Sequence, residues 1–141
     1  MPGQVQILER DDLDTAFLED RLYEFNVEAT GYRDGQDFGL VIEEAGEVAA
    51  AAAGYTWGGI CELKQLWVRA DQRGRGRGSV LLEGVVELAR DRGCRLMFLA
   101  THSFQAPDFY ARHGFEIVAT VPDKPLGHSE HIMRRTLGDK P

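Results

Sequence analysis

The sequence predicts a mixed α/β fold in one domain, spanning residues 1–141. Strand-type and helix-type hydrophobic periodicities alternate along the chain in the order β-α-β-β-β-α-β-α-β-β. Three of the strand patterns follow one another with only short turns between them, which favours an antiparallel meander. The chain has 141 residues, of which 43% are hydrophobic and 28% charged, values typical of a globular protein with one sizeable core.

The N-terminal part predicts a strand followed by a helix. Residues 4–8 alternate in polarity, as a half-buried strand does. Asp11 or Asp12 is a suitable N-cap for the helix that follows, and Gly31 ends its pattern. The apolar residues at helical spacing are Leu13, Phe17, Leu18, Leu22 and Phe25.

The central part predicts the meander. Residues 38–42 and 48–57 read as two strands joined by the turn Glu-Glu-Ala-Gly-Glu, although the second is rich in alanine, a poor strand former. A turn at 57–59 leads to a third strand over residues 60–68.

The C-terminal half predicts two helices and three strands. A helix follows the Gly/Arg segment 73–78 and ends near Gly93, and its apolar stripe comprises Leu81, Leu82, Val85, Leu88 and Ala89. Residues 95–101 form an apolar strand, and a short helix then ends at Gly114. Two further strands are expected at 116–121 and 131–137.

Composition narrows the class of protein. The net charge of −7 disfavours nucleic acid as a partner. The N-terminus shows no signal-peptide pattern and no segment has the length of a membrane span, so we expect a cytoplasmic protein without membrane contact. Cys61 and Cys94 do not form a CxxC pair, which predicts buried free thiols and no metal site.

The segment Arg-Gly-Arg-Gly-Arg-Gly at 73–78 predicts an anion site. Glycines let a ligand approach the backbone, and the free N–H groups and dipole of a helix N-terminus attract phosphate. The dinucleotide fingerprint is absent because Ser79 stands where its third glycine belongs, and the P-loop lysine is absent too. Solvated arginines in a tight turn are the structural alternative.

Two motifs together resemble the GNAT superfamily of acyl-CoA-dependent N-acyltransferases. Arg73, Gly76 and Gly78 fit its R/Q-x-x-G-x-G/A signature, and the pairs 109–110 (Phe-Tyr) and 114–115 (Gly-Phe) fit its second mark. The resemblance covers nearly the whole chain. It implies a mixed, mostly antiparallel central sheet flanked by helices, in which the fourth and fifth strands (60–68 and 95–101) are parallel and splayed.

The resemblance also implies acetyl-CoA as co-substrate. The backbone of the loop would hold the pyrophosphate, and the edge of the fourth strand would pair with the pantetheine arm. Ser103 stands where relatives often have a coenzyme-contacting asparagine, with a shorter reach. The residues implied in coenzyme binding are Leu66, Trp67, Val68, Arg73, Gly74, Arg75, Gly76, Arg77, Gly78, Ser79 and Ser103. Whether Arg75 and Arg77 bind phosphate or only solvent is left open.

For the chemistry, the resemblance places Tyr110 as the acid that protonates the departing thiolate. Glu62 is a candidate base for the amine, with an exposed pair to Lys64 as the structural alternative. A histidine (His128 or His131) or an ordered water is the other candidate base. The acceptor-binding candidates are Tyr23, Asn26, Glu28, Tyr32, Asp34 and His128.

The sequence therefore predicts an N-acetyltransferase that transfers acetyl directly, in a ternary complex, to a primary amine of a small molecule or peptide. A different acyl donor or acceptor, or a GNAT-fold sensor that binds acyl-CoA without turnover, are the alternatives. We expect no nucleic-acid partner, and a homodimer is left open.

Overall fold

The computed structural model describes residues 3–138. Two compact units divide the chain, one ending at Tyr32 and one beginning at Arg33, and each is described by itself. The first contains one helix, α1 (Ala16–Thr30). It ends as expected at Gly31, whose φ of 80° lies in the left-handed region and whose N–H donates to the carbonyl of Val27 at 2.7 Å.

Two expectations for the first unit are wrong. The helix N-cap is Thr15, not Asp11 or Asp12, and the carboxylate of Asp14 accepts the N–H of Ala16 at 3.0 Å. Residues 4–8 form no strand. A strand needs a hydrogen-bonded neighbour, and the described part of this unit, residues 3–32, contains a helix as its only regular element. Alternating polarity alone does not supply that partner.

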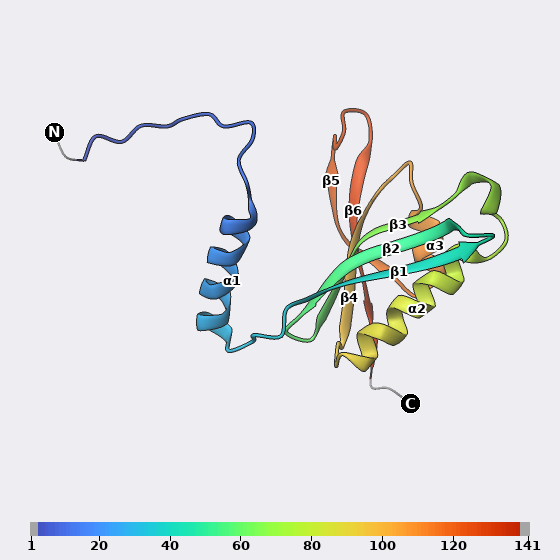
Figure 1. Ribbon diagram of the computed structural model, residues 1–141. Coiled ribbons are helices and arrows are strands. Elements are labelled where there is room, and N and C mark those ends of the chain that lie inside the picture. Colours follow the sequence, from blue (N-terminus) through green and yellow to red (C-terminus); the bar gives the residue numbers. More distant parts are fainter. Residues whose placement is uncertain (1–2, 139–141) are drawn as a thin grey trace. The chain divides into compact units, whose positions relative to one another are not determined.

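The second unit is a six-stranded sheet with its helices on one face (Figure 1). The strands lie in the order β1-β2-β3-β4-β6-β5, and every neighbouring pair is antiparallel except β3 and β4, which are parallel. The fourth and fifth strands of the prediction are thus β3 and β4. The elements are β1 (Gln36–Glu44), β2 (Glu47–Trp57), β3 (Ile60–Val68), η1 (Ala70–Gln72), α2 (Arg77–Asp91), β4 (Leu96–His102), α3 (Pro107–Arg112), β5 (Glu116–Pro122) and β6 (Ser129–Thr136).

The meander is confirmed, including its alanine-rich strand. Ala50 and Ala52 of β2 are buried in the core that β2 shares with α2, where small side chains let the helix approach the sheet closely. The β2–β3 turn consists of Gly58 and Gly59, with φ of 57° and 82°, as a two-residue hairpin requires. A side chain at Gly54 would clash with the carbonyl oxygen of Glu62, so glycine is required on this part of β2.

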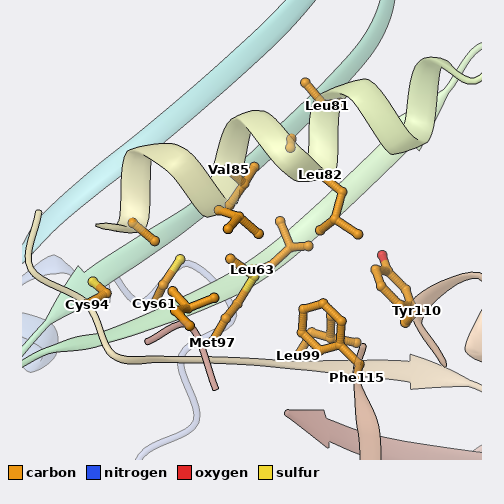
Figure 2. Close-up of a cluster of buried hydrophobic side chains, with 14 of the residues drawn as sticks. Cys61, Leu63, Leu81, Leu82, Val85, Cys94, Met97, Leu99, Tyr110 and Phe115 are labelled. Carbon is orange, nitrogen blue, oxygen red and sulfur yellow. The ribbon is translucent and has the colours of Figure 1, made fainter. Parts of the chain in front are cut away.

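One hydrophobic core lies between the sheet and the two helices (Figure 2). The stripe of α2 enters this core as predicted, and Val86 joins it. The helix ends at Gly93 (φ 80°), where the N–H of Cys94 donates to Ala89 at 2.8 Å and that of Gly93 donates to Arg90 at 2.9 Å, the Schellman arrangement. The largest fully buried side chains are Leu82, Met97, Leu99, Met133, Val85, Val86 and Cys61.

The parallel strands β3 and β4 separate soon after they begin. Their residues pair only as Ile60 with Leu96, Cys61 with Met97 and Glu62 with Phe98. Just beyond this point the pairing of β2 with β3 shifts by one residue, which makes Lys64 the extra residue of a β-bulge. The splay expected from the family resemblance is therefore present.

Candidate active site

A cavity of about 470 Å³ opens where β3 and β4 part. Residues 63–67 of β3 and 99–101 of β4 line its two sides, and residues 51–53 of β2 contribute as well. Gln105, Ala106 and Tyr110 complete the lining. Because the two strands do not pair here, main-chain groups on this edge of β3 have no partner strand.

A second cavity, of about 740 Å³, follows the Gly/Arg loop. It adjoins the first, since Leu66, Trp67, Gln105, Ala106 and Tyr110 line both. Its other lining residues are Val68, Gln72, Arg73, Gly74, Gly76, Arg77, Gly78, Ser79, Phe104, Phe109 and Arg112. Of the loop and strand residues expected to bind the coenzyme, every one except Arg75 lines this cavity.

The loop exposes backbone N–H groups to this cavity. Gly74 and Gly76 have φ of 77° and 75°, a conformation that favours glycine. The helix α2 starts directly after Gly76, and its first backbone bond runs from Val80 to the carbonyl of Gly76 at 3.1 Å. The N–H groups of the first turn, including those of Gly78 and Ser79, thus have no partner within the helix. Together with the helix dipole they make this a candidate anion-binding site.

The arginines of the loop differ in their surroundings. Arg73 donates from Nε to the carbonyl of Val68 at 3.1 Å, which fixes the loop against the end of β3. Arg77 places its guanidinium 3.6 Å from Glu44 and its Nε 3.5 Å from Gln72. Arg75 lines neither cavity. The sequence leaves open whether Arg75 and Arg77 bind phosphate, and only Arg77 lines the candidate phosphate site.

Tyr110 lies where the two cavities meet. Its side chain is 8% exposed and packs edge-on against Phe109 and Phe115, at ring distances of 5.1 and 5.7 Å. Figure 2 shows its hydroxyl pointing toward Leu82 on α2. Burial raises the pKa of Tyr110 above its ordinary value near 10, which keeps the phenol protonated at neutral pH.

Glu62 lies on β3 at the point where β3 and β4 separate. It lies on the opposite face of β3 from the buried Cys61 and Leu63 and is half-buried. It does not line either cavity, although the residue that follows it lines the smaller one. Lys64 turns to the ring of Tyr55, 5.6 Å from its centroid, so the alternative Glu62–Lys64 pair is not formed.

Neither cysteine faces the candidate site. Cys61 and Cys94 are buried in the core as free thiols (Figure 2). Burial, followed by the neighbouring Cys94, raises the pKa of Cys61 to about 12, and burial also raises the pKa of Cys94. The thiolate needed for nucleophilic attack is therefore disfavoured at both positions.

Within the second unit, several predicted site residues do not line either cavity. Ser103 accepts the N–H of Ser129 at 3.1 Å, so its hydroxyl ties two segments together. His128 packs edge-on against Phe104 at 5.0 Å, and His131 Nδ1 lies 2.9 Å from the hydroxyl of Thr120. Asp34 accepts the N–H of Gly58 at 2.9 Å. The remaining acceptor candidates, Tyr23, Asn26, Glu28 and Tyr32, belong to the first unit.

Sequence reasoning missed part of the lining. Gln72, Gln105 and Arg112 line the cavities but belong to no recognisable motif, so no sequence signal identifies them. It also missed the contact of 2.9 Å between Ser79 on α2 and His113, the residue that follows α3. Within residues 3–138, no helix is long and apolar enough to cross a membrane, and no group of three His, Cys, Asp or Glu residues is arranged to hold a metal.

Comparison with known proteins identifies the family. Residues 4–115 match the acetyltransferase (GNAT) family. A blasticidin-S acetyltransferase of Streptomyces morookaense is 37% identical over 67% of this chain and 70% of its own length. An L-methionine sulfoximine/L-methionine sulfone acetyltransferase of Pseudomonas aeruginosa is 35% identical over 66% of this chain and 58% of its own length.

The fold agrees with a solved structure as well. An acetyltransferase from Bacillus cereus superimposes with a TM-score of 0.82 at 27% identity, covering 94% of this chain and 97% of that one. The family model matches most of the chain, and the structure contains both the splayed strands and the loop with its cavity. The chain belongs to the GNAT family of acetyltransferases and is an acyltransferase.

Proposed function

We propose that the protein transfers an acetyl group from acetyl-CoA directly to a primary amine of a small molecule, within a ternary complex. The observation that carries this proposal is the pair of adjoining cavities. One contains the free N–H groups of the loop, and both reach the buried, protonated Tyr110 at the parting of β3 and β4.

The coenzyme would extend through both cavities. Its pyrophosphate binds the N–H groups of Gly76 to Ser79 and the guanidinium of Arg77, because these line the larger cavity beside a helix N-terminus. Its pantetheine amides pair with the backbone of β3 at Leu66 to Val68, as an added strand does. That edge is available because β4 leaves β3 after Glu62.

In the transfer step the amine nitrogen attacks the acetyl carbonyl carbon, and the carbon–sulfur bond then breaks. Tyr110 gives a proton to the leaving sulfur, which departs as free coenzyme A. A thiol has an ordinary pKa near 8.5, below that of the buried phenol, so we expect the proton to pass late, as negative charge develops on sulfur. The amine loses its own proton to Glu62 through a water, because the carboxylate lines neither cavity. Exchange with solvent then removes this proton from Glu62 and returns one to the Tyr110 phenolate.

A small-molecule acceptor is supported by the two curated relatives, whose names specify blasticidin-S and L-methionine sulfoximine or sulfone. The net charge of −7 also attracts a cationic amine at long range. The chain spans little more than half of the second relative, so its acceptor is proposed only as a class.

The test is release of free coenzyme A, followed with a thiol reagent, from acetyl-CoA and a panel of primary amines. Amine-dependent release with an intersecting initial-velocity pattern is expected for a ternary complex. Acetyl-CoA binding without release for any amine in the panel would indicate the alternative, a sensor without turnover. Parallel velocity lines would instead indicate an acyl-enzyme, contrary to the proposal.

A further inference from the structure

Four side chains in polar contact with one another lead away from the coenzyme loop. The hydroxyl of Ser79 lies 2.9 Å from Nε2 of His113, whose Nδ1 lies 3.4 Å from the carboxylate of Glu83. Glu83 in turn accepts from Nη1 of Arg135 at 3.2 Å. Ser79 and Glu83 are one turn apart on α2, His113 follows α3, and Arg135 is on β6.

We propose that His113 is a positioning residue for the coenzyme, which turns the Ser79 hydroxyl into a hydrogen-bond donor toward phosphate when its imidazole is protonated. The inference rests on the proposed function, since it takes the larger cavity to hold the pyrophosphate. Ser79 lines that cavity, whereas His113 contacts Ser79 and does not line the cavity.

The direction of the Ser79–His113 hydrogen bond depends on whether the imidazole is neutral or protonated. In the neutral ring Glu83 selects the tautomer with hydrogen on Nδ1, because the other tautomer would turn a lone pair toward a carboxylate. Nε2 then accepts, so the Ser79 hydrogen points to His113 and only oxygen lone pairs face the cavity. Those lone pairs repel a phosphate oxygen.

Protonation reverses this arrangement. Both ring nitrogens of His113 then donate, Nδ1 to Glu83 and Nε2 to the oxygen of Ser79. The serine hydrogen is released and is free to donate to a phosphate oxygen, beside the N–H groups of the first turn of α2. The imidazolium also adds a positive charge close to the anion.

An aromatic ring and charged groups from three elements surround His113. Its side chain is 19% exposed, and the ring of Phe109 packs against it at 4.8 Å. The charged groups around it are Glu83 on α2, Arg135 on β6 and its neighbour Arg112 at the end of α3. Arg135 is itself paired with Glu83, so a phosphate in the cavity would add the negative charge that favours the imidazolium.

The order Ser–His–carboxylate also occurs in serine hydrolases, where it activates a nucleophile. Ser79 lies on the first turn of α2, in the cavity of the Gly/Arg loop. In the proposed function this place holds phosphate, so no acyl carbon is within reach of the serine. The same chain of groups thus serves binding here.

Two measurable consequences follow. Coenzyme affinity should fall as the pH rises through the histidine range, by roughly ten- to a hundredfold if one hydrogen bond to a charged group is lost. By linkage, binding at neutral pH should take up a proton. Coenzyme A itself carries a 3′-phosphate, and phosphate monoesters titrate near pH 6, so the ligand must be one without that group.

The experiment is calorimetric titration of the full chain with dephospho-coenzyme A between pH 5.5 and 8.5, in buffers of different ionisation enthalpy. The unmodified chain should bind more weakly at high pH and take up a proton near neutrality. His113→Asn and Ser79→Ala should each flatten the pH dependence. His102→Gln should not, since His102 lies outside both cavities and bonds to the carbonyl of Lys124.

The outcomes separate this inference from the proposed function. Binding of the unmodified chain that is independent of pH and of buffer overturns the role of His113 and leaves the coenzyme site standing. Failure of that chain to bind either dephospho-coenzyme A or acetyl-CoA at every pH overturns both. Proton uptake is measured without any substitution, so the test holds even if His113→Asn fails to fold.

Discussion

Glu62 on β3 and Phe98 on β4 are the last two residues in register before these parallel strands separate. The smaller cavity begins one residue further along β3, at Leu63. The β-bulge at Lys64 follows at once, and Gly54 on β2 leaves room for the carbonyl oxygen of Glu62. Pairing on both sides of β3 therefore fixes the backbone position of Glu62 at the point where β3 and β4 separate.

Replacing Tyr110 with phenylalanine should separate catalysis from packing. The ring contacts with Phe109 and Phe115 are kept, and only the hydroxyl is lost. We expect acetyl-CoA affinity to change little, because the phenol acts on a thiolate that exists only as the bond breaks. The rate constant at saturation should fall by roughly 10²–10⁴-fold, or about 3–5 kcal/mol of barrier.

The pH profile provides the control for Tyr110. Because burial raises the pKa of this phenol, it should remain protonated, and the acid should remain available, from neutral through mildly alkaline pH. A loss of rate between pH 7 and 9 must then have another origin. Full turnover by Tyr110→Phe would remove the acid from the mechanism and leave the fold and the coenzyme site unchanged.

Glu62→Gln should lower turnover most at neutral pH. An alkyl amine has a pKa near 10, so at pH 7 it is largely protonated and needs a base. At high pH the amine is neutral without help, and the loss of rate should shrink. The ratio of the two rate constants measured from pH 7 to 10 tests this. A ratio that stays constant over that range would indicate that the carboxylate does not serve as the base.

Gly76→Val should abolish acetyl-CoA binding. Gly76 has a φ of 75°, and nothing lies within 4 Å of an added Cβ, so the side chain would occupy the phosphate approach. Left-handed backbone costs a valine about 1–2 kcal/mol, so stability falls as well. Gly93→Val is a matched control, with a φ of 80°, open surroundings and a position at the far end of α2.

Thermal shift with millimolar acetyl-CoA distinguishes the two glycine variants. Both should melt lower than the unmodified protein, and only the Gly93 variant should recover stability on addition of ligand. Equal recovery by both would place the pyrophosphate elsewhere.

Most of the fold was predictable because its patterns are local. The stripe of α2, the end of that helix at Gly93 and the limits of β3 follow from residues within a few positions of one another. The strand expected at 4–8 was wrong because a strand must pair with a second segment. The alternating polarity of residues 4–8 describes one segment and does not show whether a partner exists. The N-cap of α1 was wrong because Asp11, Asp12, Asp14 and Thr15 are all suitable N-cap residues in sequence.

The candidate site was predictable where a motif marks it and not elsewhere. Tyr110 and the loop residues except Arg75 line the cavities, and the roles that the family resemblance implies for them stay predictions. The contact between Ser79 and His113 spans 34 positions, and that between Glu44 and Arg77 joins a strand end to a helix start. Neither leaves a periodic signal, because each depends on how separate elements pack.

Arg77→Ala and Arg75→Ala should differ in their effect on binding. Arg77 lines the larger cavity and Arg75 does not, so only the first should weaken acetyl-CoA binding. Arg77→Ala should also lower stability slightly, because Glu44 loses its ion pair and one of its carboxylate oxygens is already buried without a partner among the described residues. Equal Kd values for the two variants would contradict this assignment.

The combination Arg77→Ala with Glu44→Gln separates the two effects. Removing the carboxylate charge should restore stability and leave acetyl-CoA binding weak. Recovery of binding in the double variant would mean that Arg77 acts on the coenzyme only through the fold.

The final prediction concerns the thiols, and it distinguishes direct transfer from a covalent intermediate. The pKa of Cys61 is raised to about 12 by burial, so less than about one thiol in a thousand is ionised at pH 8. Cys94 is also buried, and neither thiol lines a cavity. We expect neither cysteine to react with a thiol reagent at pH 8 in the native protein, and both to react after denaturation.

The corresponding variants should retain activity. Cys61→Ala removes a fully buried side chain and should cost some stability, but turnover per folded molecule should be unchanged. Cys61→Val fills the site with an apolar side chain that has no thiol, so comparison with Cys61→Ala controls for packing. An acetyl group trapped on either cysteine after acid quench, or loss of turnover in both Cys61 variants while they remain folded, would show that transfer passes through a thioester on the protein. Intersecting velocity lines with both variants would show that the amine attacks the coenzyme thioester itself, and Tyr110 then remains the group positioned to protonate the departing sulfur.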